Sequence, residues 1–223
     1  LEPKSVFRFF EEMCAIPHGS RNTKAVSDWC ADFARARGLE YHQDGDNNII
    51  IIKEAAPGYE AAPPVILQGH LDMVCEQTAG DFVYAKGTTL GGDDGIAVAM
   101  ALALLDAEGL PHPRLEAVFT VDEEIGLLGA ASIDVTPLKG RQMLNLDSEA
   151  EGIFTVSCAG GNTSACLLPL TRAPFDGAGV TVAVGGLTGG HSGAEIHKGR
   201  ANANVLMGRI LRAAARRTEL RLL

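Results

Sequence analysis

With 223 residues, the chain is long enough for one large domain or for one domain and part of another. Hydrophobic residues make up 46% and charged residues 21%, as in ordinary soluble globular proteins, and a formal net charge of −9 argues against nucleic-acid or anionic-membrane partners, which would be repelled. No apolar run approaches the roughly 20 residues that cross a bilayer, and charges at Glu2, Lys4 and Arg8 do not fit a signal peptide.

Apolar runs alternate with amphipathic segments over most of the chain, which is typical of an α/β sheet. In chain order, the expected elements are helices over 5–15 and 23–37, strands at 39–43 and 48–52 around a turn, a strand at 65–67, an alanine-rich helix over 95–105, and strands at 115–121 and 142–146. Such short apolar strands are usually buried on both faces. We therefore predict a three-layer α/β/α domain with helices on both faces of the sheet.

The pattern changes near residue 174, where proline, aspartate and glycine cluster. A strand is expected at 180–184 and a basic amphipathic helix over 202–217. We predict a catalytic domain over 1–174 and the beginning of a smaller α+β lid domain over 175–223. The basic helix is typical of a solvated lid face or a dimer contact rather than of nucleic-acid binding, given the negative net charge.

The five cysteines are an odd number without Cys-x-x-Cys spacing. Free thiols in a reducing compartment account for this pattern, so we expect a cytoplasmic protein. Cys75 lies three residues beyond Asp72 and is expected to be a free thiol rather than a metal ligand.

A histidine and several acidic residues follow the ends of three predicted strands. His70 and Asp72 share a face in extended chain, which suits an imidazole ligand with a carboxylate behind it. Glu123 and Glu124 belong to a run of three acids that needs solvation or a cation, and Asp147 follows the next strand. Each group alone is consistent with an exposed surface residue. Together they predict one site, because sites in open α/β sheets form at the carboxyl ends of strands.

The segment Gly91–Gly95 carries Asp93 and Asp94 between glycines, just before a predicted helix. Phosphate binding is excluded, because two aspartates would repel a phosphate and no Gly-Lys-Ser/Thr follows. Capping of the helix by one aspartate is an equally good interpretation of this segment alone. Beside the strand-end groups, Asp93 becomes a candidate metal ligand.

The candidate donors indicate the kind of metal. Imidazole with carboxylates suits Zn²⁺, Mn²⁺ or Co²⁺, whereas an all-oxygen set suits Mg²⁺ or Ca²⁺. Four candidate ligands exceed the usual set of about three protein ligands and a water on one catalytic zinc. We therefore expect two divalent ions, zinc being the first choice, roughly 3.5–4 Å apart and bridged by an aspartate.

Six segments then carry a resemblance to a known family: QGHLDMV, KGTTLGGDDGIAVA, DEEIGLLGA, LNLDSE, SCAGG and GGHSGAEIHKGRANAN. In this order they are similar to the two-metal peptidases that include carnosinases, carboxypeptidase G and acetylornithine deacetylase. Within that family they most resemble aminoacyl-histidine (Xaa-His) dipeptidases, over nearly the whole chain. The resemblance implies hydrolysis of Xaa-His dipeptides and a homodimer formed through the lid domain.

Carried over by position, the resemblance implies that His70 and Asp147 bind one metal ion. Glu124 would bind the other ion, and Asp93 would bridge the two. This set leaves the second ion one ligand short, because the family's last ligand is a histidine far downstream that nothing here matches. We therefore expect a catalytic domain whose C-terminal part is absent, in a fragment that can be inactive by itself. The interval from Glu76 to Ala85 is also shorter than is usual in these dipeptidases.

The resemblance also implies roles around the metals. Glu123 would be the general base, Asp72 would orient His70, and His191 would polarise the scissile carbonyl. Without the family pattern, His191 is equally consistent with an ordinary polar loop residue. Arg200 suits a substrate carboxylate. Asn202 is a further candidate for substrate binding, although a helix N-cap explains it equally well.

Two alternatives to an Xaa-His dipeptidase stay open. A deacylase of N-acyl amino acids or an aminopeptidase would use the same chemistry. A non-catalytic metal-binding or oligomerisation fragment would use the same scaffold without turnover, and the presence of Glu123 argues against it for the whole protein.

Overall fold

The computed structural model describes residues 1–73, 90–148, 152–158, 160, 164–171, 174, 176–190 and 195–219. The chain divides into two compact units, Leu1–Ile153 and Phe154–Leu223. The two units meet between Ile153 and Phe154, before the predicted domain boundary at 174/175. That boundary stays a prediction.

A five-stranded mixed sheet with the order β1-β2-β4-β3-β5 forms the centre of the first unit. β1 (Glu40–Gln43) and β2 (Ile49–Lys53) form an antiparallel hairpin, and β2 also pairs antiparallel with β4 (Leu115–Thr120). β3 (Val65–His70) lies between β4 and β5 (Gln142–Asn145) and is parallel to both. The carboxyl ends of these three strands consequently meet at one edge of the sheet.

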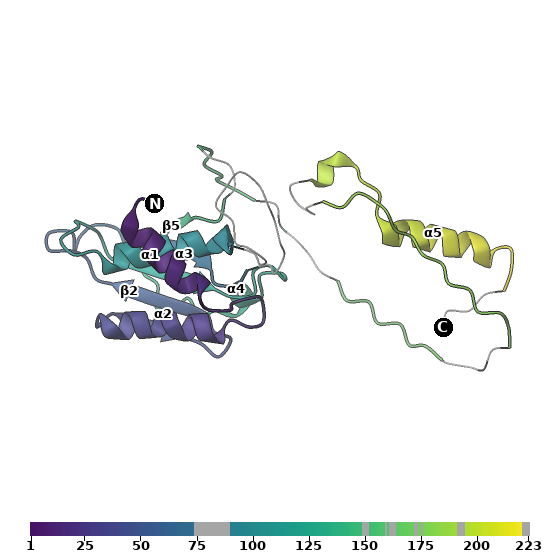
Figure 1. The fold of residues 1–223 in the computed structure, drawn as a ribbon, viewed down its shortest axis with the longest axis horizontal. Helices are drawn as coiled ribbons and strands as arrows, with labels where there is room; N and C mark the ends of the chain where they lie inside the picture. The colour runs from purple at the N-terminus through teal and green to yellow at the C-terminus, as the bar shows by residue number, and fades with distance from the viewer. Residues whose placement is uncertain are drawn as a thin grey trace. The chain divides into compact units, whose positions relative to one another are not determined.

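Three helices pack on one face of this sheet: α1 (Lys4–Cys14), α2 (Lys24–Ala36) and α3 (Gly92–Asp106), which Figure 1 shows together with β2. The apolar residues of α1 recur at helical spacing and are buried, and the ring of Phe9 meets that of Phe33 on α2 edge to face at 5.4 Å. Alternate residues of the strands, such as Ile49 and Phe119, complete this core. The predicted helices and strands of the first unit are therefore confirmed, with ends shifted by a few residues.

The opposite face of the sheet carries a smaller core made of Ile50, Ile52, Ile66 and Val118. Ile133 and Leu138 pack against it, just after the short helix α4 (Leu128–Ser132). The α/β class is confirmed. Among the described residues of the first unit, however, the three long helices α1, α2 and α3 share one face, because apolar strands require cover on both faces without specifying a helix.

Glu116 attaches the segment after α4 to the sheet. Its side chain is fully buried and accepts hydrogen bonds from Arg114 Nε and from the backbone N–H groups of Lys139 and Gly140. These contacts lower the pKa of the Glu116 carboxyl although its burial alone would raise it.

The second unit contains a 3₁₀ turn, η1 (Ile196–Lys198), and the helix α5 (Ala203–Ala215). The prediction of a helix over 202–217 is confirmed. The strand expected at 180–184 is wrong, since these residues form no regular element. A strand needs a hydrogen-bonded neighbour, and the described residues of this unit provide none.

No helix in the described ranges is long and apolar enough to cross a membrane. Four cysteines are free thiols, namely Cys14, Cys30, Cys158 and Cys166. Cys75 and the short interval from Glu76 to Ala85 lie outside the described residues.

Candidate metal centre

His70 is the last residue of β3, and its side chain is 1% exposed. Its Nδ1 lies 2.7 Å from the backbone carbonyl oxygen of Asp72. Because a carbonyl oxygen can only accept, Nδ1 carries a proton, and Nε2 is the nitrogen that a metal ion could bind. Nε2 lies 3.2 Å from Oδ1 of Asp93.

One ligand atom each from His70, Asp93 and Glu124 lies within 4.8 Å of the others. Two ligands on one zinc ion, each about 2.1 Å from it, are at most about 4.2 Å apart. Small side-chain movements therefore bring the three atoms to coordination distance. One imidazole and two carboxylates also suit Zn²⁺, Mn²⁺ or Co²⁺, so the residues present fit a divalent ion.

Glu123 lies beside this cluster, with Oε2 3.9 Å from Nε2 of His70. Burial raises the pKa of its carboxyl; the His70 charge opposes this shift, and the charges of Asp147, Asp72 and Asp93 add to it. A carboxyl with a raised pKa takes up a proton closer to neutral pH, as a general base must. Asp147 is not part of the three-residue cluster, but its charge acts on Glu123, so it lies in the same region.

Asp72 contacts His70 through both its side chain and its backbone. Its Oδ1 is 3.5 Å from Nδ1 of His70, and its backbone carbonyl oxygen makes the shorter contact at 2.7 Å. The carboxylate accepts hydrogen bonds from the N–H groups of Glu123 at 3.0 Å and Glu124 at 3.4 Å, and from the Ser20 hydroxyl at 2.8 Å. Burial alone would raise the pKa of Asp72, but its contacts with His70, Glu123 and Ser20 lower it.

Asp94 contacts the backbone of His70. Its Oδ2 accepts a hydrogen bond from the backbone N–H of His70 at 3.2 Å, and burial raises the pKa of this carboxyl to about 7 against the opposing charge of His70. A Cβ atom at Gly69 would lie 2.7 Å from Oδ2, so this approach requires glycine. Asp93 and Asp94 have non-helical dihedral angles within α3. Within the described residues, no side chain caps α3, whose N-cap is Gly91, so the Asp94 carboxylate holds the backbone of His70 rather than capping the helix.

The predicted substrate residues belong to the second unit. His191 lies outside the described residues. Arg200 forms an ion pair with Glu195 at 2.7 Å, so its guanidinium already has an internal partner. Asn202 accepts a hydrogen bond from the N–H of Val205 at 3.1 Å, which confirms its role as the N-cap of α5.

The loop after α1 brings residues to the site that no sequence motif marks. The Ser20 hydroxyl binds Asp72, and the Arg21 N–H donates to Asp122 Oδ1 at 2.6 Å. The N–H of Met73 donates to the carbonyl oxygen of His18 at 3.2 Å. This loop therefore joins the ends of both β3 and β4.

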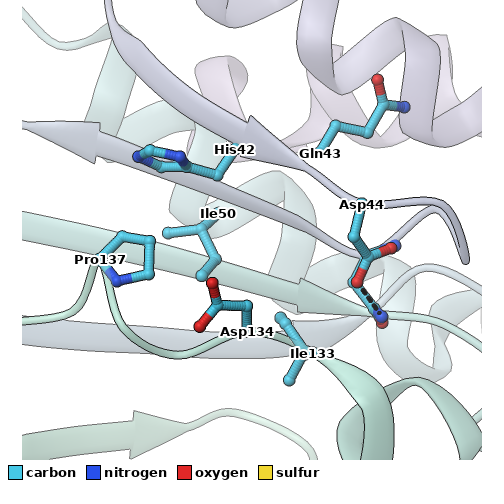
Figure 2. Close-up of a pocket in the computed structure, with 8 residues that line it drawn as sticks. His42, Gln43, Asp44, Ile50, Ile133, Asp134 and Pro137 are labelled. Atoms are coloured by element: carbon cyan, nitrogen blue, oxygen red, sulfur yellow. Dashed lines mark hydrogen bonds between the residues drawn. The ribbon is translucent and has the colours of Figure 1, made fainter.

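A separate hollow of about 160 Å³ lies beside the β1–β2 hairpin (Figure 2). Figure 2 shows Asp44 at one end of it and Asp134 beside Ile50 and Ile133. Asp44 Oδ2 accepts a hydrogen bond from Asn48 Nδ2 at 2.7 Å. Asp134 is itself held by the N–H and hydroxyl of Thr136. The acidic groups of this hollow are thus engaged by their own loops, and none belongs to the metal cluster.

No family model matches the chain. The chain is 37% identical to the cytosol non-specific dipeptidase of Escherichia coli (strain K12) over 243 aligned positions, which cover the whole chain and 50% of that relative. The crystal structure of aminoacylhistidine dipeptidase from Vibrio alginolyticus matches with a TM-score of 0.64 and 31% identity, over 100% of this chain and 49% of that one. The crystal structure of a tripeptidase from Staphylococcus aureus shares the fold with a TM-score of 0.57. It is 23% identical to this chain, and the match covers 66% of this chain and 44% of the tripeptidase chain.

The sheet, the strand-end cluster and these similarities define the fold of a peptidase catalytic domain. The chain belongs to the peptidase family that includes the cytosol non-specific dipeptidase and aminoacylhistidine dipeptidase, as its motifs predicted. It spans about half the length of both relatives.

Proposed function

We propose that the protein containing this chain is a metal-dependent dipeptidase. The observation that carries this proposal is the cluster of His70, Asp93 and Glu124, with the Glu123 carboxylate 3.9 Å from His70. Ligands and a base thus stand together at one edge of the sheet. The printed names of two relatives, both dipeptidases, support the same activity.

Two divalent ions, zinc first and manganese or cobalt as alternatives, would be held by His70 and Asp147 on one side, by Glu124 on the other, and by Asp93 between them. When bound, they would acidify a water and polarise the scissile carbonyl. Glu123 takes the proton of the attacking water and returns a proton to the leaving amine. His70 keeps its proton on Nδ1 through the Asp72 carbonyl, and so presents Nε2.

We further propose a preference for Xaa-His dipeptides, supported by the motifs and by the name of the Vibrio relative. His191 would contact the scissile carbonyl, and Asn202 would shape the substrate-binding region. Arg200 would bind the substrate carboxylate only after exchanging its contact with Glu195. A homodimer through the lid and a cytoplasmic location belong to the same proposal, the latter supported by the name of the E. coli relative.

The test is turnover by the full-length protein of three substrate panels: Xaa-His dipeptides, other dipeptides, and N-acyl amino acids. Release of histidine with two bound metal ions per chain is the expected result. Hydrolysis of N-acyl amino acids but not of dipeptides would instead establish a deacylase. A protein that neither binds metal nor turns over any panel would be a non-catalytic module.

A further inference from the structure

The buried carboxylate of Asp72 joins three segments that are far apart in sequence. It lies just beyond β3 and is 1% exposed. Oδ1 accepts the N–H of Glu123 at 3.0 Å, while Oδ2 accepts the Ser20 hydroxyl at 2.8 Å and the N–H of Glu124 at 3.4 Å. One side chain therefore fixes the backbone of both neighbouring glutamates.

These two glutamates have different proposed tasks at the site, proton transfer for Glu123 and metal binding for Glu124. They are consecutive residues at the start of one turn, in which the carbonyl oxygen of Glu123 accepts from the N–H of Gly126, and Asp122 just before them has a positive φ of 54°. A change in the position of this turn displaces the base and the ligand together. The contacts of Asp72 thus act on both tasks at once.

Ser20 makes the shorter of the two contacts to Oδ2. Without its hydroxyl, Oδ2 keeps the N–H of Glu124 at 3.4 Å, a long distance for an N–H···O hydrogen bond. The neighbouring Arg21 N–H binds the Asp122 carboxylate, so the same loop holds the turn at a second point. The Ser20 hydroxyl is therefore well placed to stop the carboxylate from rotating.

We propose that Ser20 is a positioning residue, which acts through Asp72 to hold the Glu123–Glu124 turn in place for metal binding and proton transfer. The inference rests on the proposed dipeptidase function. It adds a residue from outside the six motifs to the active site.

Ser20→Ala, Ser20→Thr and Ser27→Ala in the full-length protein provide the test. Ser27 is a matched control, because it is fully buried and its hydroxyl accepts a hydrogen bond from Gln43 at 2.8 Å, away from the metal cluster. For each variant, Zn²⁺ affinity is measured by competition with a chromophoric chelator, kcat and KM on a dipeptide, and Tm by thermal denaturation.

We expect Ser20→Ala to lower kcat about tenfold and to weaken Zn²⁺ binding severalfold, with KM changed less than about twofold. Ser20→Thr, which keeps the hydroxyl, should recover most of both losses. Ser27→Ala should lower Tm without changing kcat or Zn²⁺ affinity.

Two results would overturn the inference: Ser20→Ala matching Ser27→Ala in kcat and Zn²⁺ affinity, or Ser20→Thr being as impaired as Ser20→Ala. If the wild-type protein binds Zn²⁺ but cleaves no dipeptide, the proposed function fails by itself. The role of Ser20 is then decided by the Zn²⁺ affinities of the same variants.

Discussion

Glu123 is the residue on which proton transfer in the proposed reaction depends. Burial raises the pKa of its carboxyl, and a general base of this kind contributes about 10²–10⁴-fold to the rate. Glu123→Gln keeps the shape of the side chain and removes its basicity. We expect kcat to fall by about 10²–10⁴-fold with both metal ions retained, as measured by steady-state kinetics and elemental analysis.

Glu124→Gln provides the contrast, because its carboxylate belongs to the cluster of ligand atoms. This variant should lose metal as well as activity. Equal metal loss in the two variants would contradict the separate roles proposed for the two glutamates.

The pKa of His70 predicts how the affinity for metal changes with pH. Burial alone would lower its pKa, but the carboxylates of Asp72 and Asp94 raise it to about 10 in the metal-free protein. The ring is therefore protonated at neutral pH, and a metal ion must displace this proton in order to bind Nε2. Metal affinity should consequently fall as the pH is lowered from about 10.

Titration calorimetry at pH 7 in buffers of different ionisation heat measures this proton. We expect release of about one proton that His70→Ala removes and that His42→Ala, a change at an exposed histidine, leaves in place. Identical binding heats across the buffers would show that His70 is neutral before metal binds.

At the scale of elements, the C-terminal end of α3 is held by a side chain from the sheet. Lys53 Nζ, at the end of β2, donates to the carbonyl oxygens of Leu105 at 2.9 Å and Ala107 at 2.7 Å. Carbonyls at a helix end lack partners within the helix and carry partial negative charge. A partly buried ammonium group therefore stabilises this end of α3.

Lys53→Met keeps the aliphatic stem and removes these donors. We expect the free energy of unfolding to fall by about 1–3 kcal/mol in urea denaturation. Lys24→Met is the control, because Lys24 is exposed and pairs with Asp28 on the same helix, and an exposed ion pair of this kind contributes little to stability. Equal effects of the two substitutions would exclude a specific role for Lys53.

The elements also show which parts of the structure local patterns can predict. The strands that end at His70 and Thr120 can be predicted because each is a short apolar run in the sequence, and the structure buries both runs. Their parallel pairing brings the acids at the strand ends together. The segment 180–184 shows the limit of this reasoning, because alternation describes a strand but cannot provide its partner. α4 was missed because it has five residues and no capping side chain. The contact of Ser20 with Asp72 spans 52 residues, and no local motif encodes it.

At the scale of the whole molecule, a bound metal should couple to folding. The carboxylates of Asp72 and Asp94 are buried beside those of Asp93, Glu123 and Glu124, and the mutual repulsion of these acids is relieved by a divalent cation. Ligand binding to the native state stabilises it by about 2.7 kcal/mol at 100 times Kd. We therefore expect the Tm of the full-length protein to rise by several degrees with Zn²⁺ and to fall after treatment with a chelator.

Differential scanning calorimetry of the wild type and of an Asp93→Ala variant tests this coupling. The variant should show a much smaller response to Zn²⁺, because it lacks the proposed bridging ligand. A response equal to that of the wild type would place the stabilising metal elsewhere in the molecule.

The division into Leu1–Ile153 and Phe154–Leu223 also bears on how such a protein can change in evolution. The residues proposed to bind metal and the proposed general base all lie in the first unit, whereas the residues proposed to recognise the peptide lie in the second. Under the proposed function, mutations in the second unit can retune which dipeptide is accepted while the reaction chemistry is inherited intact. Exchange of the second unit between relatives is therefore a direct route to new specificities.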